Sequence, residues 1–348
     1  MIPLAGLSQK EIEELISPLP RFRADQIFKW ILKGVCGFDQ MSNIPVSMQN
    51  ELASRFCIFS GTVTQSHVAD NTRKIVILLK DGIKTEAVLL SDNKKRFTAC
   101  LSTQAGCPAG CVFCKTGSIG FKRNLDSSEI TEQFFHLQNE IVKNNKGHII
   151  DNIVVMGMGE PLLNLSNLRK AIAFFTDPAG MNFSKRRITI STCGIYEGLV
   201  DIAKNGPFIR LALSLVTADE DLRALLMPVS KSNPLIKIKE AILLYQRNSG
   251  GRITLEVPLL GGINTRSADA KSIADFAKGI ETVINIIPWN PVSGLEFKGK
   301  PLIEPEKKES EDFIQMLKNH KLKVTVRMHK GQGIMGACGQ LGAEDQPG

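Results

Sequence analysis

The chain has 348 residues, of which 43% are hydrophobic and 22% charged, and its formal net charge is +8. This ordinary globular composition excludes a mostly disordered chain and allows one large domain or a large domain with a smaller companion. No apolar run approaches the roughly 18 residues that cross a bilayer, and the N-terminus lacks the features of a secretory signal, so we expect a cytoplasmic protein.

The first 60 residues are expected to be helical. Ser8 and Glu11 form a capping box in front of an apolar-periodic run, which predicts the start of a first helix. Two further helices are expected over 23–33 and from 45 to about 56. Between 61 and about 103 the pattern changes to short β-rich segments that are separated by turn signals.

After a capped helix that is expected over 126–144, strand-like and helical segments alternate. The strand-like segments lie at 152–156, 187–191, 210–215, 252–258, 283–288 and 322–327. This alternation is typical of βα units around a parallel sheet, either open or closed into a barrel. The sequence therefore predicts an α/β fold whose chemistry gathers at the carboxyl ends of the strands.

Four of the eight cysteines lie within fifteen residues, which indicates metal or redox chemistry rather than structural disulfides. Cys107, Cys111 and Cys114 form a C-x3-C-x2-C arrangement. Thiolates are the natural ligands of iron–sulfur clusters. Three of them would leave the fourth iron of a [4Fe–4S] cluster open to the amino and carboxylate groups of S-adenosylmethionine (SAM). We interpret the segment as a cluster-binding loop.

Two alternatives to a cluster remain open from the residues alone. Zinc prefers four nitrogen or sulfur ligands in structural sites, and no histidine lies within twenty residues of the three cysteines. A zinc site would therefore need a ligand from a distant segment. Inert cysteines are the weaker alternative, because Gly106, Pro108 and Gly110 give the loop a special shape.

The segment CPAGCVFC follows the first strand of the βα series and resembles the signature of radical SAM enzymes. Its surroundings are similar to the RlmN/Cfr family of radical SAM RNA (adenosine) methyltransferases, over nearly the whole chain and in the same order. The motifs are FRADQIFKWI at 22–31, TACLSTQAGCPAGCVFCKTG at 98–117, GMGEPLLN at 157–164, RRITISTCGI at 186–195, IIPWNP at 286–291 and GACGQLG at 336–342.

The resemblance implies a partial (βα)6 radical SAM barrel with a small helical N-terminal accessory domain. The expected parts are a helical RNA-binding domain at 1–60, a β-rich extension at 61–96, the radical SAM core at 97–330 and a C-terminal segment at 331–348. The implied cofactors are a [4Fe–4S] cluster and SAM.

By the same resemblance, Cys338 accepts a methyl group from SAM, and Cys100 resolves a covalent protein–RNA adduct by forming a transient disulfide with Cys338. Such a thiol is useful because a ring carbon of adenine is too electron-poor to attack a methyl sulfonium, whereas a thiolate can. Without the family, Cys100 would be interpreted as a packed strand residue and Cys338 as an incidental thiol. Glu86 matches the family's general base, although a lone strand glutamate usually faces solvent.

The resemblance also implies SAM contacts at the ends of successive strands. Gly159 and Glu160 match the positions that contact the SAM amino group, and the other matching positions are Ser191, Ser214, Leu215, Val216 and Asn290. Val216 stands where the family commonly has histidine, and Gly333 stands where an acidic residue is usual. These departures concern substrate choice and not the class of reaction.

The implied reaction is methylation of an adenosine ring carbon, C2 in the first place, in 23S ribosomal RNA, with transfer RNA as a further candidate substrate. The alternatives are C8 methylation of the Cfr type and a non-catalytic zinc-dependent RNA-binding protein. Basic groups at 94–96, 122–123 and 185–187 suit an RNA partner, although any one of them is more often a solvated face. A reductant such as flavodoxin or ferredoxin and a monomeric state are also expected.

Overall fold

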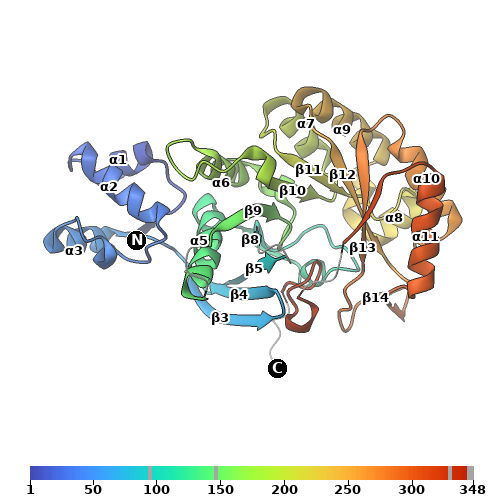
Figure 1. Ribbon diagram of the computed structural model, residues 1–348, viewed down its shortest axis with the longest axis horizontal. Coiled ribbons are helices and arrows are strands. Elements are labelled where there is room, and N and C mark those ends of the chain that lie inside the picture. The colour runs from blue at the N-terminus through green and yellow to red at the C-terminus, as the bar shows by residue number, and fades with distance from the viewer. Residues whose placement is uncertain (93–95, 145–147, 328–330, 343–348) are drawn as a thin grey trace.

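One sheet of ten strands organises the molecule, for which the computed structural model describes residues 1–92, 96–144, 148–327 and 331–342 (Figure 1). The strands β6, β9 to β13 and β16 run parallel, and β3 to β6 are antiparallel. In spatial order the strands are β16 (Val324–Val326), β13 (Thr282–Pro288), β12 (Ile253–Leu259), β11 (Arg210–Ser214), β10 (Ile188–Thr192), β9 (Ile150–Val155), β6 (Phe97–Cys100), β5 (Lys84–Ser91), β4 (Thr72–Leu78) and β3 (Thr62–Ala69).

A helical domain at the N-terminus lies at one end of the molecule, drawn in blue in Figure 1. The predicted capping box is present, because Ser8 and Glu11 cap each other in front of the first helix. The helices are α1 (Gln9–Ile16), α2 (Arg21–Leu32) and α3 (Val46–Arg55), and β1 (Ile2–Pro3) pairs with β2 (Phe56–Cys57) to close the domain.

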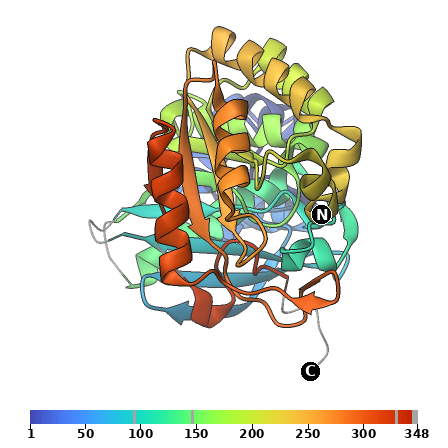
Figure 2. The same cartoon turned by 90° about the vertical axis from the view of Figure 1, so that its right-hand side faces the viewer.

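Helices cover the outer side of the parallel strands, as Figure 2 shows for the part of the chain beyond residue 200. They are α5 (Ser127–Asn144), α6 (Leu165–Thr176), α7 (Tyr196–Asn205), α8 (Glu220–Leu226), α9 (Leu235–Ser249), α10 (Ser267–Ala277) and α11 (Lys307–Asn319). The predicted α/β class with a parallel βα core is therefore confirmed. Among the described residues, no helix combines the length and low polarity that a membrane crossing requires.

Short elements connect these parts. They are the helix α4 (Lys115–Ser118), the two-stranded pairs β7 (Gln104–Gly106) with β8 (Phe121–Asn124) and β14 (Glu296–Phe297) with β15 (Lys300–Pro301), and the single 3-10 turns η1 (Phe38–Gln40), η2 (Pro161–Asn164), η3 (Lys185–Arg187), η4 (Pro228–Ser232) and η5 (Gln332–Ile334). The sequence did not predict the two short pairs of strands, because a strand of two to four residues carries too little periodicity to be recognised.

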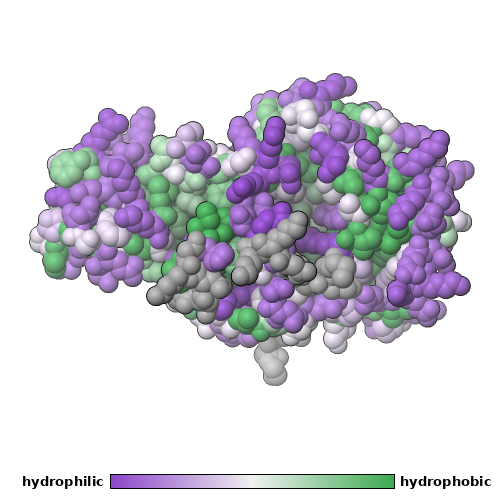
Figure 3. Space-filling model, in the orientation of Figure 1, coloured by the Kyte–Doolittle hydropathy of each residue, from purple (hydrophilic) through white to green (hydrophobic). Residues whose placement is uncertain are grey.

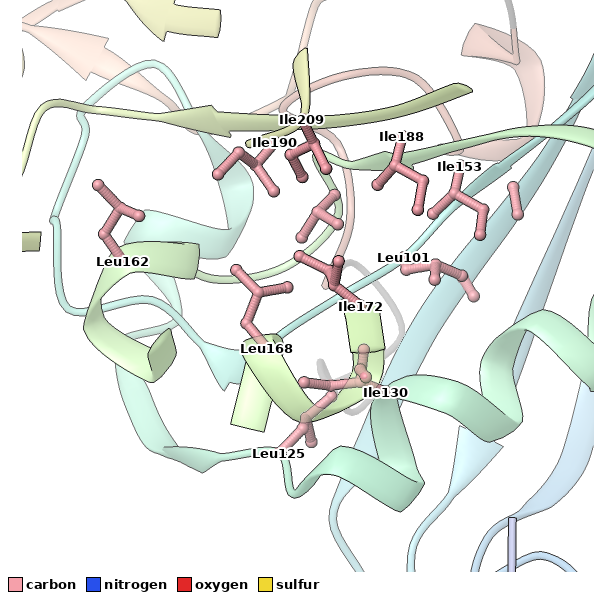
Figure 4. Packing of buried hydrophobic residues seen from close by; sticks show 14 of the residues in the cluster. Leu101, Leu125, Ile130, Ile153, Leu162, Leu168, Ile172, Ile188, Ile190 and Ile209 are labelled. Atoms are coloured by element: carbon pink, nitrogen blue, oxygen red, sulfur yellow. The ribbon is translucent and has the colours of Figure 1, made fainter. Parts of the chain in front are cut away.

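The hydrophobic core lies between the sheet and its helices. Ile153, Ile188 and Ile190 point outward from β9 and β10, toward Leu168 and Ile172 of α6 (Figure 4). These five side chains are almost fully buried. Each buried side chain of this size contributes about 1.5–3 kcal/mol of burial free energy, so this layer fixes the spacing of the strands.

The inner faces of the same strands line an open interior. Along β10 the outward Ile188 and Ile190 are buried, whereas the inward Thr189 and Ser191 remain half-exposed. The inward residues form two layers. The upper layer, at the carboxyl ends of the strands, contains Met156, Ser191, Ser214, Glu256 and Ile287. The lower layer, toward the amino ends, contains Thr98, Asn152, Thr189, Ala212, Thr254 and Asn285.

The gap between the two edges of the sheet is bridged by residues 331–342, which we call the clasp. The clasp follows β16 at one edge, and its turn η5 packs against β3 at the other edge. The side chain of Thr116 donates a hydrogen bond of 2.8 Å to the carbonyl of Leu341, and the amide of Lys115 donates one of 2.8 Å to the carbonyl of Gly339. The clasp is thereby attached to the helix that follows the cysteine-rich loop.

Candidate active site

The cysteine-rich loop begins where β7 ends, and its shape depends on a glycine. Gly106 has a φ of +75°, and any side chain there would collide with the Gly120 carbonyl. That carbonyl accepts a hydrogen bond of 3.0 Å from the amide of Cys107. The backbone can therefore turn sharply and bring Cys107 back toward Cys111 and Cys114, and all three line one cavity of about 1020 Å³.

The middle of the loop is held from the opposite wall of the barrel. The indole Nε1 of Trp289 donates a hydrogen bond of 2.9 Å to the carbonyl of Phe113. The amide of Val112 donates one of 3.0 Å to the carbonyl of Leu226 at the end of α8. These contacts fix the loop above the upper layer of the barrel.

The three cysteines fit a multinuclear cluster better than a single metal ion. A zinc ion binds sulfur at 2.3 Å in a tetrahedron, which requires ligand sulfurs about 3.8 Å apart. Within the described residues, no three His, Cys, Asp or Glu side chains converge on a point in this way. An iron–sulfur cluster binds each thiolate at a different iron and so accepts a wider spacing. Burial raises the pKa of Cys107 to about 12, so ligation has to drive deprotonation.

The GMGEP turn after β9 forms the next part of the wall. Gly159 has a φ of +99°, and a side chain there would come within 2.5 Å of Gln104. Glu160 is buried, and burial raises its pKa. Its carboxylate nevertheless accepts hydrogen bonds of 2.7 Å from the Thr192 hydroxyl and from the Cys193 amide. These donors hold the side chain against the cavity in one orientation.

Two predicted serines meet a carboxylate that the sequence did not reveal. The hydroxyl of Ser191 lies 3.1 Å from that of Ser214 and donates a hydrogen bond of 2.7 Å to Glu256 Oε2. All three side chains line the cavity. A charged residue in the otherwise apolar strand of residues 253–259 was the available signal, because a buried carboxylate needs hydrogen-bonding partners.

The remaining predicted SAM positions divide into two groups. Asn290 lines the cavity, and its side-chain amide donates a hydrogen bond of 3.0 Å to the carbonyl of Cys338. Leu215 and Val216 are fully buried behind the wall, where both backbone amides donate to the carbonyl of Glu256, at 2.9 and 3.2 Å. The structure thus brings Asn290 to the cavity but not the side chains of Leu215 and Val216.

The two isolated cysteines lie together. Cys100 and Cys338 line a second cavity of about 510 Å³, with Met156 and Arg327 on its wall. Cys338 also lines the cavity of the cluster loop, and it is an exposed residue. Burial raises the pKa of Cys100 to about 12 and also raises the pKa of Cys338, while the guanidinium of Arg327 lowers both. Neither Arg327 nor Met156 belongs to a motif that could have been recognised in the sequence.

Glu86 lines neither cavity, and Lys74 and the clasp both contact it. It is 2% exposed, and its carboxylate lies 3.3 Å from Lys74 Nζ. The other carboxylate oxygen accepts a hydrogen bond of 2.7 Å from the amide of Gly342 in the clasp. Glu86 therefore holds the end of the segment that carries Cys338.

Comparison with known proteins accounts for this arrangement. The model of the radical SAM superfamily matches residues 101–274. The model of the ribosomal RNA large subunit methyltransferase N-terminal domain matches residues 2–58. The probable dual-specificity RNA methyltransferase RlmN of Treponema denticola is 48% identical over 98% of this chain and 95% of that protein. The protein of the same name from Moorella thermoacetica is 39% identical over 98% of this chain and 97% of that protein. The chain belongs to the RlmN family of radical SAM RNA methyltransferases.

A solved structure agrees with this assignment to the RlmN family. The crystal structure of a radical SAM methyltransferase from Sphaerobacter thermophilus superposes on this structure with a TM-score of 0.93 at 33% sequence identity. The superposition covers 99% of this chain and 100% of the Sphaerobacter chain. The predicted radical SAM fold and the predicted class of enzyme are confirmed. As a radical SAM enzyme of the RlmN family, the protein uses a [4Fe–4S] cluster and SAM.

Proposed function

We propose that this enzyme methylates C2 of an adenosine in 23S ribosomal RNA and also acts on transfer RNA. The observation that carries the proposal is the shared cavity of Cys100 and Cys338, which meets the cavity of the cluster loop at Cys338 itself. One thiol is then reachable both from the cofactor side and from the second thiol. The printed name of the relatives, dual-specificity RNA methyltransferase, supports two kinds of RNA substrate.

In this proposal Cys107, Cys111 and Cys114 hold the cluster. When bound, the cluster and SAM supply one-electron cleavage chemistry that can remove a hydrogen atom from a methyl group. SAM is oriented by the side chains and backbone that line the cavity, namely Gly159, Glu160, Ser191, Ser214 and Asn290. Leu215 and Val216 act from behind the wall, where their amides hold β12 against this loop.

Cys338 is the proposed methyl acceptor, because its sulfur must attack a sulfonium methyl that a ring carbon of adenine cannot attack. The resulting S-methylcysteine carries the carbon that bonds to the base. The Cys100 thiolate then attacks the sulfur of Cys338, the bond between that sulfur and the methylene of the adduct breaks, and a disulfide forms. The methylene carbon keeps the electron pair of the broken bond and takes up a proton, so the base leaves with a methyl group. Glu86 is the proposed acceptor of the ring proton, and the amide of Gly342 has to move off its carboxylate before it can act.

The proposed organisation follows the expected boundaries. The helical domain of residues 1–60 grips RNA, residues 61–96 extend the sheet, residues 97–330 form the radical SAM core, and residues 331–348 carry the methyl-accepting cysteine. A cytoplasmic reductant such as flavodoxin or ferredoxin reduces the cluster, and the enzyme acts as a monomer. Cytoplasmic location suits a transient disulfide, since the thiols must be reduced after each turnover.

The proposal is tested by an anaerobic assay with reconstituted protein, SAM, a reductant and protein-free ribosomal RNA or transfer RNA, read by nucleoside mass spectrometry. We expect 2-methyladenosine. A product of 8-methyladenosine would replace C2 by C8, as in the Cfr branch. Cleavage of SAM without any methyladenosine in either RNA would contradict the proposed substrate.

Two variants test the roles of the thiols in the same assay. Cys338→Ala should abolish methylated nucleoside and methyl-cysteine together. Cys100→Ala should form methyl-cysteine but accumulate a protein–RNA adduct, visible as a band that ribonuclease removes. Cys36→Ala is the matched control, since Cys36 is exposed and lines neither cavity. Normal turnover of Cys338→Ala would refute the mechanism.

A further inference from the structure

The barrel interior contains a cavity that methyl transfer leaves unassigned. It is lined by the lower layer of the barrel together with Arg96, Arg187 and Arg210 near the amino ends of the strands and Arg327, which follows β16. It shares Leu90, Met156 and Arg327 with the cavity of Cys100 and Cys338, so the two spaces adjoin. None of the three cluster cysteines lines it.

The lower layer is mostly polar where a barrel is normally packed. Parallel barrels usually fill their interior with bulky branched side chains. Here Thr98, Asn152, Thr189 and Thr254 face the space and are half-exposed. Their side chains make no hydrogen bond within the described part of the chain. Such a surface is stable only when it is wet or when it faces a polar ligand.

Two arginines lie at the rim of this cavity. Arg187 directly precedes β10, and Arg210 is the first residue of β11. Because Arg210 pairs with Thr189 in the register of the sheet, the two arginines lie at the starts of neighbouring strands. Both are exposed, and neither forms an ion pair with any described residue. Figure 3 shows much hydrophilic surface on the face of the molecule that it draws.

The other charges on the wall leave an excess of positive charge. Arg96 is paired with Asp92 at 2.6 Å. Arg327 faces Glu256, which is the other carboxylate on the wall. Four arginines against two carboxylates give a net charge of +2 to the lining of the cavity. An anionic ligand is therefore favoured there.

We propose that the lower layer and its arginine rim bind the sugar–phosphate backbone of the RNA strand that carries the target adenosine, with Arg187 and Arg210 each contacting a phosphate. This inference rests on the proposed function. The guanidinium group suits phosphate because it offers parallel N–H donors to two oxygens. The hydroxyl and amide groups of the lower layer can donate to, or accept from, the 2′-hydroxyls that distinguish RNA from DNA.

The geometry favours single-stranded RNA with the target base turned out of its stack. Ser191 lies four positions after Arg187 along the chain, which corresponds to about 13 Å of extended strand. A base that reaches Cys338 from below would thus have its neighbouring phosphates at the level of the arginines. A duplex cannot enter a barrel of this kind, so the base has to leave its stack first.

The test measures RNA binding and methylation separately. The salt dependence of binding to protein-free ribosomal RNA is measured by filter binding for the wild type, Arg187→Gln, Arg210→Gln and the double variant. Loss of one phosphate contact should lower the slope of log K against log salt by about 0.7–0.9, and the double variant should lose about twice as much. Its KM for RNA should rise about tenfold, the change expected for roughly 1.4 kcal/mol of lost binding.

The matched control is Arg247→Gln, which removes the same charge from the exposed face of α9. SAM binding and methylation of Cys338 in the absence of RNA should be unchanged in every variant, which would show that the fold and the cofactor site are intact. An unchanged salt slope in the double variant would overturn the inference. So would a loss of turnover that appears only with flavodoxin and not with dithionite, because the arginines would then dock the acidic electron donor.

The experiment distinguishes a failure of this inference from a failure of the proposed function. If the wild type binds RNA but makes no methyladenosine, the proposed substrate fails, while the salt slopes still decide whether the arginines contact phosphate. If the wild type methylates RNA and the variants bind and turn over as the wild type does, only the inference fails.

Discussion

Lys74 and Glu86 form an ion pair that is almost closed to water, with side-chain exposures of 0% and 3%. Removing two charges from water is costly, and their mutual attraction offsets that cost only when both partners are present. Here the Gly342 amide supplies a further hydrogen bond to the carboxylate. The stability of the pair and the position of the clasp are therefore linked at one residue.

Replacing Lys74 by methionine should lower the free energy of unfolding by about 3–5 kcal/mol, since it removes the cation that lies 3.3 Å from a buried carboxylate. Urea unfolding at neutral pH measures the change. The double variant Lys74→Met with Glu86→Leu should recover most of the loss, because it removes both charges. If the double variant were less stable than Lys74→Met, the cost would come from packing and not from the unpaired charge.

Among single residues, those that belong to a sequence motif could be predicted as functional. The residues that they contact could not. Cys107, Cys111 and Cys114 are recognisable from spacing alone. Lys74 has no local signature, and the charge of Glu256 within its strand does not reveal its partners, because the partners of both residues lie on other strands. Only the sheet register brings such pairs together.

Among the elements, the connection between the helical domain and β3 depends on one carboxylate of α5. Glu132 accepts hydrogen bonds from the amide of Ser60 at 2.5 Å, from its hydroxyl at 2.9 Å and from the amide of Gly61 at 2.9 Å. Gly61 is required there, because a side chain would come within 2.6 Å of the carboxylate. Burial nevertheless raises the pKa of Glu132 to about 7.

This raised pKa predicts a pH dependence of stability. Between the ordinary value of 4.5 and about 7, the folded protein keeps a proton on Glu132 that the unfolded chain has released. Stability should therefore be greatest below this window and fall by up to about 3 kcal/mol as pH rises through it. Urea midpoints at pH 5 and pH 8 should differ less in Glu132→Gln than in the wild type. Equal differences would contradict the assignment, and Glu197→Gln, which alters an exposed residue of α7, is the control.

Helices and strands could be predicted from the sequence where a hydrophobic periodicity extends over many residues. The β-rich region expected between 61 and about 103 contains β5, and the capped helix expected over 126–144 is α5. It was harder to predict from the sequence which face of a strand points into the barrel. In β10 the pattern of alternating Ile and Thr or Ser suggests a polar face toward solvent, but that face lines the barrel interior.

For the molecule as a whole, the net charge of +8 suits a polyanionic substrate. The predicted basic group at 185–187 contains Arg187, which lines the lower cavity, whereas Lys94 and Lys95 lie outside the described residues. Charge alone could not have distinguished these groups. The sheet topology decides which of them faces the interior.

RNA binding should therefore be much more sensitive to salt than SAM binding. Each phosphate neutralised contributes about 0.7–0.9 to the slope of log K against log salt, whereas SAM releases few counterions. Filter binding of RNA and calorimetry of SAM between 50 and about 200 mM salt provide the comparison. Similar slopes for the two ligands would indicate that RNA is held mainly by uncharged contacts.

The clasp also determines when the enzyme becomes competent during synthesis. The cluster cysteines leave the ribosome more than two hundred residues before Cys338 does. The parallel strands up to β16 can form before the clasp bridges the sheet edges. A nascent chain can thus acquire its metal-binding loop without possessing a methyl acceptor. Translation order therefore installs the nucleophile last, and a truncated chain that lacks residues 331–348 would be unable to form a covalent bond to RNA through Cys338.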